Sequence, residues 1–172
     1  YADRSEFMGD ADFVSVPSDI LTSKVYAERR MKDYSEDKAS TSSEVNHGDA
    51  YYRESDQTTH YSVADKDGNM VSVTTTLNDV FGNKSVVNGA GFFLNNEMDD
   101  FVSKPGVPNI YGLVGNEANS IEPEKRMLSS MTPSIIFKDK KPFLIIGSPG
   151  GGRIITTVLQ TVINIIDYLI LR

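Results

Sequence analysis

Two adjacent threonines, Thr58 and Thr59, stand where a polar stretch ends and an alternating run of apolar and polar residues begins. A threonine hydroxyl is a weak nucleophile until a base removes its proton, and the free α-amino group of the same residue, with an unperturbed pKa of about 7.7–8.0, can do this. That amine exists only after the bond between Gln57 and Thr58 is cut. On residue type alone, a structural role in a strand is the better interpretation, because β-branched residues are common there.

A glycine-rich segment, GSPGGGR at residues 147–153, joins an expected strand to an expected helix. Consecutive glycines let backbone N–H groups approach a ligand closely, and at a helix N-terminus these groups point at negative charge. Three interpretations stay open: a phosphate-binding loop, an oxyanion hole for acyl transfer, or a tight turn. The GxxxxGK[ST] pattern of phosphate-binding loops is absent, because Arg153 and Ile154 stand where Lys and Ser or Thr would be.

Two polar clusters could hold a charged ligand. Glu97, Asp99 and Asp100 could bind a metal ion, or they could hold an ammonium group through charge-assisted hydrogen bonds. A solvated acidic turn is the favoured interpretation of these residues taken alone. Ser129 and Ser130 could donate hydrogen bonds to a carboxylate, but the pair indicates little by itself.

The composition limits the available chemistry. The chain has 172 residues, no cysteine and two histidines, His47 and His60, which excludes disulfides, thiol catalysis and cysteine-based zinc sites. His60 would share the strand face of Thr58, where a lone histidine is more often a structural partner than a catalyst. The net charge of −7, without a basic stripe, argues against a nucleic-acid partner.

Two hairpins are expected to position these residues. The runs HYSVAD and MVSVTT flank KDGN, at residues 66–69, and its Asp-Gly pair is a strong turn signal. A second hairpin is expected over residues 131–152, with KDKK at its turn. A short apolar, strand-like piece lies within residues 88–101, and the Gly- and Pro-rich residues 104–116 indicate a loop.

Helical periodicity is expected in two places. One helix begins at about Ser18, which would be its N-cap, and carries apolar Ile20, Leu21, Val25 and Met31. A longer helix is expected over residues 153–172, with an apolar face made of Ile155, Val158, Leu159, Val162, Ile166 and Leu169. Polar residues interrupt it, so we expect it to pack on a sheet rather than span a membrane. The polar residues 35–57 between the two helices are the best candidate for a linker that is easily cut.

In order along the chain, five motifs resemble the γ-glutamyltransferase (γ-glutamyl transpeptidase) family: TTHYSV, NNEMDDF, KPGVPNIYGLVG, KRMLSSMTPSI and GSPGGGRIITTVLQ. Residues 1–57 resemble the C-terminal tail of the large subunit, with a helix and a polar linker, and residues 58–172 resemble most of the small catalytic subunit. The family implies an α+β fold, the N-terminal nucleophile (Ntn) hydrolase αββα sandwich. We therefore expect a partial domain, truncated at its C-terminus and inactive alone.

The resemblance also implies roles for particular residues in catalysis. The precursor would cut itself between Gln57 and Thr58, and Thr58 would become the new N-terminus and the nucleophile. Thr76 matches the threonine whose hydroxyl contacts the nucleophile. Gly150 and Gly151 match the glycines of the oxyanion hole, which selects one of the interpretations of the glycine-rich segment.

Substrate binding is implied by the same match. A γ-glutamyl group carries an α-ammonium and an α-carboxylate. The residues implied to hold these groups are Asn78, Glu97 and Asp100 for the ammonium, and Ser129 and Ser130 for the carboxylate. Tyr111 lies in the segment that resembles the lid over the site.

The implied reaction is a ping-pong acyl transfer from glutathione, or from related γ-glutamyl amides, to water or to an amino acid or peptide acceptor. No cofactor and no metal are expected. The expected protein partner is the remainder of the large subunit, which holds the family's carboxylate-binding arginine. Periplasmic or secreted placement is implied by the resemblance alone, because the first residues do not resemble a signal peptide.

Other functions stay open at this point. A related Ntn amidase could act on poly-γ-glutamate or on cephalosporin side chains, although the lid-like loop and the acidic cluster favour glutathione-type substrates. A non-enzymatic module could bind phosphate through GSPGGGR. The chain could also be an inert fragment in which the site is not assembled.

Overall fold

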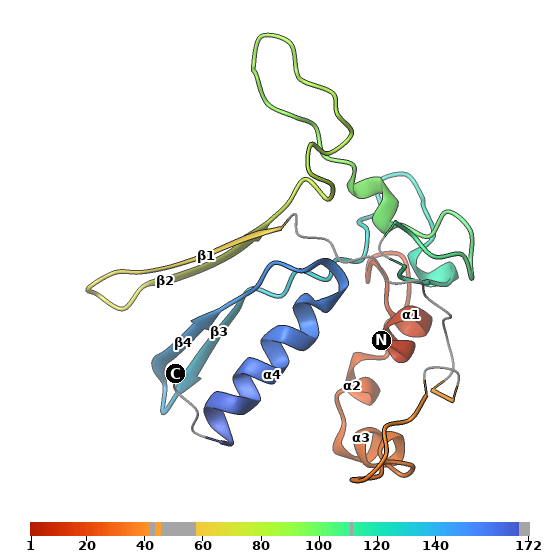
Figure 1. The fold of residues 1–172 in the computed structure, drawn as a ribbon, viewed down its shortest axis with the longest axis vertical. Helices are drawn as coiled ribbons and strands as arrows, with labels where there is room; N and C mark the ends of the chain where they lie inside the picture. Colours follow the sequence, from red (N-terminus) through yellow and green to blue (C-terminus); the bar gives the residue numbers. More distant parts are fainter. Residues whose placement is uncertain (42–43, 46–57, 111, 169–172) are drawn as a thin grey trace. The chain divides into compact units, whose positions relative to one another are not determined.

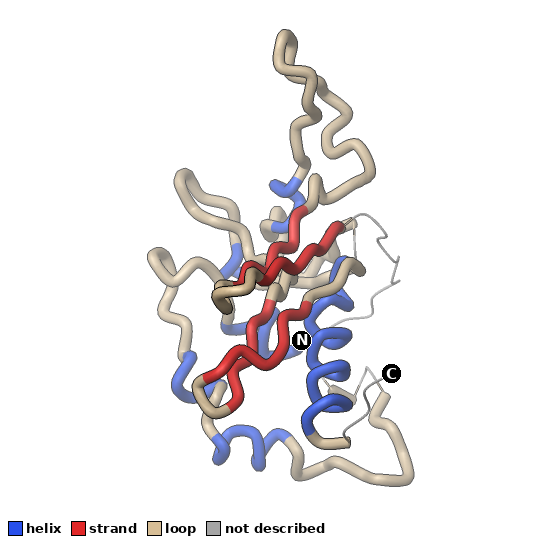
Figure 2. The backbone as a smooth tube through the Cα atoms, turned by 90° about the vertical axis from the view of Figure 1, so that its left-hand side faces the viewer, coloured by secondary structure: helices blue, strands red, loops and turns tan. Residues whose placement is uncertain are grey.

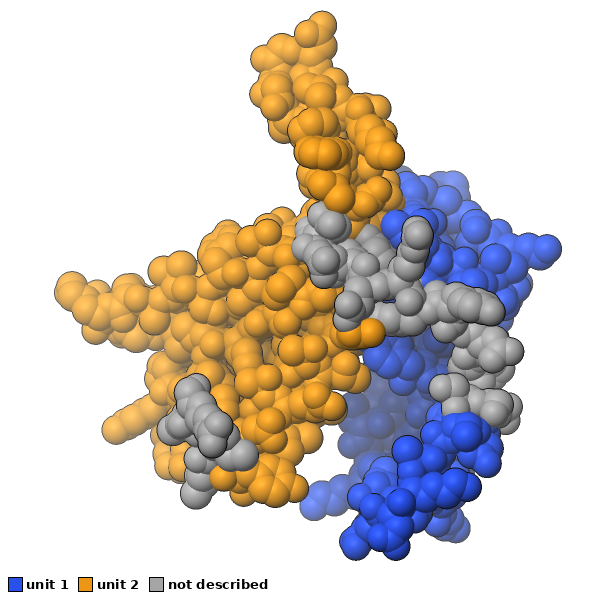
Figure 3. All heavy atoms as spheres, viewed as in Figure 1, with its two compact units in different colours: residues 1–53, 98–128 blue, residues 54–97, 129–172 orange. Residues whose placement is uncertain are grey.

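A computed structural model describes residues 1–41, 44–45, 58–110 and 112–168 (Figure 1). The chain forms two compact units, one from Tyr1–Arg53 and Met98–Leu128, the other from Glu54–Glu97 and Ser129–Arg172 (Figure 3). Each unit is built from segments that are far apart in the sequence. The predicted division into residues 1–57 and 58–172 follows the expected cleavage instead, and it stays a prediction.

The second unit begins with an antiparallel hairpin of β1 (Thr59–Ala64) and β2 (Met70–Thr75). The side chain of Asp65 closes its turn, because Oδ1 accepts a hydrogen bond from the backbone N–H of Asn69 at 2.9 Å and Oδ2 accepts one from its side-chain amide at 2.7 Å. Gly68 adopts a φ of 84°, which glycine tolerates without strain. The hairpin predicted around KDGN is confirmed.

The second hairpin consists of β3 (Ser134–Lys138) and β4 (Lys141–Ile146). Its turn residues Asp139 and Lys140 have φ values of 52° and 61°. Positive φ at both central residues matches the two-residue turn whose twist suits flanking strands. The hairpin predicted with KDKK at its turn is therefore also confirmed.

The two hairpins lie near each other within the second unit (Figures 1 and 2). The hydroxyl of Ser72 on β2 donates a hydrogen bond to the backbone carbonyl of Ile146, the last residue of β4, at 3.3 Å. Figure 1 shows the turns of both hairpins on the left and their open ends toward the centre. The segments that enter and leave the two hairpins therefore meet on one side of the unit.

A one-turn 3₁₀ helix, η3 (Gly151–Arg153), leads into α4 (Ile154–Ile166), which runs beside the β3–β4 hairpin (Figure 1). The side chains of Ile154 and Val158 are 1% and 4% exposed, and their spacing of four places them on one helix face. The predicted long helix is confirmed over Ile154–Ile166, but its predicted apolar face is wrong in part, because Ile154 is buried whereas Leu159 and Ile166 are 53% and 48% exposed. Leu169 lies outside the described part of the chain. Among the described residues, no helix is long and apolar enough to cross a membrane.

The strand-like piece expected within residues 88–101 is reduced to one isolated bridge between Val86 and Phe93. Gly89 and Gly91 adopt φ values of 81° and 74°. Such positive values interrupt an extended strand, which explains why the apolar run does not pair further.

Short helices dominate the regular structure of the first unit: α1 (Ala2–Phe7), α2 (Ser18–Leu21), α3 (Lys24–Arg30) and η2 (Glu117–Asn119). The prediction of one helix from Ser18 is wrong. Ser23 ends the first helical turn and caps a new helix, because its Oγ accepts a hydrogen bond from the backbone N–H of Tyr26 at 3.2 Å. The N-cap of α2 is Pro17 rather than Ser18.

Asp10 joins the two segments of the first unit. Its side chain is 1% exposed, and it accepts hydrogen bonds from the backbone N–H, Nε and Nη2 of Arg126 at 2.8, 2.9 and 2.5 Å. These hydrogen bonds hold the pKa of Asp10 well below its usual range. Nearby, a side chain at Gly9 would overlap the backbone carbonyl of Ala118, so the two segments approach backbone to backbone.

We expect Asp10→Asn to lower the unfolding temperature clearly, because it leaves the guanidinium of Arg126 without its buried carboxylate. Asp12→Asn is the matched control. Asp12 pairs with the same arginine, but its side chain is 75% exposed, and exposed ion pairs contribute little. Thermal and urea unfolding of both variants measures the difference.

The pH dependence of this effect follows from the sign of the shift. The pKa of Asp10 is lower in the folded chain than in the unfolded one, so its contribution is complete above the usual aspartate pKa of about 3.9. The stability gap between wild type and Asp10→Asn should therefore hold from neutral pH to about pH 5 and shrink only in stronger acid. Equal destabilisation by the two variants would contradict the assignment.

Candidate active site

The register of the first hairpin ends with Thr59 and Thr75, which pair at the open end of β1 and β2. Thr58 and Thr76 are the next residues on either strand at this open end. Thr58 is half-buried, whereas Thr59 is exposed. Because alternate strand residues face opposite sides, Thr58 and Thr59 point in different directions. The predicted nucleophile and the predicted hydroxyl partner therefore directly flank the last pair of the hairpin, and their contact stays a prediction.

His60 lies on the same strand face as Thr58. Its Nδ1 is 2.8 Å from Oγ1 of Thr74, and its Nε2 is 3.0 Å from Oγ of Ser62. Both ring nitrogens therefore have hydroxyl partners, as expected for a structural partner. This face also carries Ser72, whose hydroxyl contacts the end of β4.

The predicted oxyanion residues lie where β4 passes into α4. Gly150 and Gly151 have φ values of 129° and 51°, so both adopt conformations that side-chain-bearing residues rarely take. Gly150 is the N-cap of η3, directly ahead of α4. Backbone N–H groups at such a helix start favour negative charge, which is what an oxyanion hole requires.

Asn78 contacts Asn96, the residue directly before Glu97. The side chain of Asn78 is buried, and its Nδ2 donates to the backbone carbonyl of Asn96 at 3.3 Å. The backbone N–H of Asn96 in turn donates to the carbonyl of Leu77 at 3.1 Å. Two of the three residues predicted to bind an ammonium group therefore lie on segments that are hydrogen-bonded to each other, and their joint role stays a prediction.

Glu97 opens the 3₁₀ helix η1 (Glu97–Asp100), and Asp100 closes it. Burial raises the pKa of Glu97. A carboxylate that has lost hydration gains more from a bound cation than an exposed one does. Asp100 belongs to the first unit, where its backbone carbonyl accepts a hydrogen bond from the side chain of Asn119 at 2.7 Å.

Ser129 and Ser130 lie in the extended segment that enters β3. Ser134, the first residue of β3, pairs with Ile146, the last residue of β4. The serine pair and the glycine-rich segment therefore leave the same end of the second hairpin. Ser129 is exposed, and its Oγ accepts a hydrogen bond from the backbone N–H of Met131 at 3.1 Å.

Two predicted residues, Gln57 and Tyr111, lie outside the described part of the chain. Among the described residues, no three histidine, aspartate or glutamate side chains form a group that could hold a metal ion.

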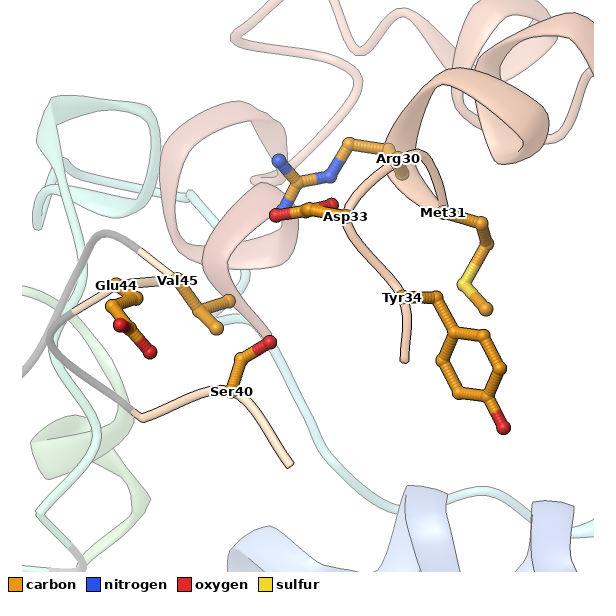
Figure 4. A pocket seen from close by; sticks show the side chains of 7 residues that line it. All are labelled: Arg30, Met31, Asp33, Tyr34, Ser40, Glu44 and Val45. Carbon is orange, nitrogen blue, oxygen red and sulfur yellow. The ribbon is translucent and has the colours of Figure 1, made fainter. Parts of the chain in front are cut away.

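A pocket in the first unit contains none of the predicted site residues (Figure 4). Its lining comes from the end of α3 and the residues that follow: Arg30, Met31, Asp33, Tyr34, Ser40, Glu44 and Val45. Arg30 is engaged in an ion pair with Asp3 at 3.2 Å. The pocket offers no chemistry that extends the predicted site.

Sequence reasoning missed several residues that build the site. Gly147 lies against the ring of His60, and Asn96 holds Asn78. The alternation of the strands could have indicated Thr74 as a partner of His60, because the two are opposite each other in the register. No comparable signal marks Asn96, whose contact depends on the path of the intervening loop.

The chain matches one known protein family over nearly its whole length. A sequence profile of the gamma-glutamyltranspeptidase family matches residues 1–169. Over 98% of its length the chain is 59% identical to the glutathione hydrolase proenzyme of Escherichia coli K12 and 52% identical to that of Pseudomonas sp. strain A14. The chain, a mixed α and β protein, therefore belongs to the gamma-glutamyltranspeptidase family, and it spans 29% of the length of each of these relatives.

Solved structures of the same family resemble this chain. A mutant gamma-glutamyltranspeptidase of Helicobacter pylori is 63% identical, with a TM-score of 0.64, over 66% of this chain and 61% of that one. The enzyme of Pseudomonas nitroreducens complexed with L-DON is 57% identical, with the same TM-score, over 66% of this chain and 58% of that one. A more distant relative is the Acylase ACY 1 proenzyme of Pseudomonas sp. strain SE83, 37% identical over 98% of this chain.

The conformation of Asn78 gives a test of the site's framework. Its φ of 75° lies in the left-handed region, which costs a residue such as alanine roughly 1–2 kcal/mol. We expect Asn78→Gly to lose only the amide contacts, whereas Asn78→Ala should be about 1 kcal/mol less stable again. Denaturant unfolding of the two variants measures this step, and a more stable alanine variant would show that the backbone strain is absent.

Proposed function

We propose that this chain is part of a self-cleaving glutathione hydrolase, or γ-glutamyltransferase, with Thr58 as its nucleophile. The observation that carries the proposal is the open end of the first hairpin, where Thr58 and Thr76 flank the Thr59–Thr75 pair and the ring of His60 contacts Gly147, the start of the glycine-rich segment. Family membership and the similarity to glutathione hydrolase proenzymes support the same reaction. The Ntn hydrolase αββα sandwich is proposed as the fold of the complete protein, on the same grounds.

Self-cleavage would proceed by an N-to-O acyl shift. The Oγ of Thr58 attacks the carbonyl carbon of Gln57, the C–N bond breaks, and the hydroxyl proton passes to the departing nitrogen. Water then opens the resulting ester, which leaves a carboxylate on Gln57 and a free amine on Thr58. That amine is the base that the mature nucleophile needs.

Acyl transfer would use the same hydroxyl. The α-amine of Thr58 takes the proton as Oγ attacks the γ-carbonyl of the donor, and the oxyanion is stabilised by the backbone N–H groups at Gly150 and Gly151. The amide C–N bond breaks, and the leaving amine receives the proton. Water or an acceptor amine then takes the γ-glutamyl group and restores the hydroxyl of Thr58.

Binding of the donor's α-groups completes the proposed site. Asn78, Glu97 and Asp100 would hold the ammonium through charge-assisted hydrogen bonds. Ser129 and Ser130 would hold the carboxylate, with Tyr111 in the lid.

The proposed protein context rests on family resemblance. Residues 1–57 would be the end of the large subunit and residues 58–172 most of the small one. The remainder of the large subunit would be the partner, and the protein would be periplasmic or secreted.

Two alternatives are weighed by the same observations. The acylase relative is 37% identical, well below the 59% of the glutathione hydrolase relative, so γ-glutamyl donors are preferred over the amides of a related acylase. A phosphate-binding role for GSPGGGR predicts saturable binding of inorganic phosphate. Titration with phosphate and with a γ-glutamyl amide, followed by calorimetry, separates the two.

The central prediction concerns cleavage. In the full-length precursor, Thr58→Ala should remain uncut and inactive, because no hydroxyl is available for the acyl shift. Thr59→Ala is the matched control, since this neighbour is exposed and faces away, and it should be cut normally. A denaturing gel and the mass of the new chain end give the answer, and a cut Thr58→Ala precursor rules out this nucleophile.

A second prediction concerns pH. Burial raises the pKa of Glu97, and only its ionised form attracts the donor's ammonium, so KM should rise as pH falls through this raised value. Glu97→Gln should abolish this rise of KM at low pH. It should also raise KM about 10-fold at neutral pH, as expected when a hydrogen bond to a charged group is lost. A glutaryl amide, which lacks the α-amino group, is the matched control and should be insensitive to the variant. If KM of Glu97→Gln still rose at low pH as in the wild type, the titration would belong to another group.

A further inference from the structure

The contact between His60 and Gly147 links the nucleophile strand to the glycine-rich segment. A side chain at position 147 would overlap the Nδ1, Cε1 and Cγ atoms of the His60 ring. The φ of Gly147 lies outside the left-handed region, so its conformation is open to other residues. Glycine is required here by the imidazole ring, which leaves no room for a Cβ.

The ring itself is held from both sides. Its Nδ1 and Nε2 lie at hydrogen-bonding distance from the hydroxyls of Thr74 and Ser62, at 2.8 and 3.0 Å. Because a hydroxyl can both donate and accept, either neutral tautomer of the ring satisfies both contacts. The ring is therefore a fixed spacer, anchored to both strands of the first hairpin.

A second contact fixes the same junction. Ser72, on the strand face of His60, donates to the carbonyl of Ile146, the residue directly before Gly147. The end of β4 thus meets the first hairpin at two consecutive residues. Gly150 follows only three residues later, and Thr58 lies two residues before His60 on its own face.

We infer that His60 is a positioning residue that sets the distance between the Thr58 hydroxyl and the backbone N–H groups at Gly150 and Gly151. This inference rests on the proposed function. The ring does not act as the base for Thr58, because both of its nitrogens are engaged with Thr74 and Ser62. It acts through the start of the glycine-rich segment, whose displacement would move the oxyanion donors away from the reacting carbonyl.

The test is a double-variant cycle in the full-length precursor. His60→Ala should lower kcat about 10- to 100-fold with KM nearly unchanged, since a displacement of about 1 Å in a catalytic group has effects of this size. Gly147→Ala should be similarly harmful beside the native ring, because the ring and the new methyl group overlap. In the His60→Ala background, Gly147→Ala should add little, since the ring is gone. Tyr61→Ala, an exposed neighbour on the opposite face, is the control and should leave kcat unchanged.

Two further readouts exclude a purely structural explanation. The pH profile of kcat should keep its shape in His60→Ala, and loss of one limb would instead make His60 an acid or base and overturn the inference. Additive effects of His60→Ala and Gly147→Ala would overturn it as well. Values of kcat are taken per cleaved chain, from the fraction cut on a denaturing gel, so that slower self-cleavage is not counted as slower transfer.

Backbone amide resonances can be measured without any enzymatic assay, so they separate this inference from the proposed function. The backbone amide resonances of Gly150 and Gly151 should shift in His60→Ala and stay in place in Tyr61→Ala. Ser62→Ala, which removes one partner of the ring but keeps the ring itself, should produce a smaller shift and serves where His60→Ala folds poorly. If the wild-type protein shows no γ-glutamyl transfer, the proposed function fails, and the resonances still decide the spacer role. Unmoved resonances in His60→Ala would refute it.

Discussion

The site depends first on the pairing register of β1 and β2. This register sets Thr59 opposite Thr75, next to Thr58 and Thr76, and His60 opposite Thr74. A slip by one residue would turn every side chain of a strand to the other face. The hydroxyls would then point away from the end of β4, and the ring would leave Gly147. The turn that fixes the register is closed by Asp65, at the far end of the hairpin from Thr58 and Thr76.

Backbone geometry prepares the rest of the site. Gly150 and Gly151 have positive φ, and Asn78 adopts a left-handed conformation. Gly147 has no side chain, which leaves room for the ring of His60. Each of these features limits what other residues could stand there. Together they place N–H groups and a buried amide before any substrate arrives, which is how preorganised sites avoid reorganisation during the reaction. The partly buried Glu97 adds a charge that has already lost part of its hydration.

The parts predictable from the sequence are those governed by local rules. Both hairpins were predictable because alternation and turn residues act over a few positions. The helix expected from Ser18 failed for an equally local reason, since the hydroxyl of Ser23 competes for the backbone and starts a new helix. The ion pair of Asp10 and Arg126 could not be predicted from the sequence, because the two residues are separated by 116 positions and no sequence pattern relates them. The site residues were predictable as a set only through the ordered family motifs.

The division of the chain into units bears on what self-cleavage would do. A cut after Gln57 would place Asp10 and Arg126 on different polypeptides, although both belong to the first unit. Their ion pair is buried on the carboxylate side and reinforced by two further hydrogen bonds from the same arginine, so separating the products would break all three interactions at once. The close backbone contact of Gly9 with Ala118 would be lost as well. After the proposed cleavage, the tail would thus be held by contacts that do not involve the cut bond, and the amine of Thr58 would become free without release of the first unit's N-terminal half.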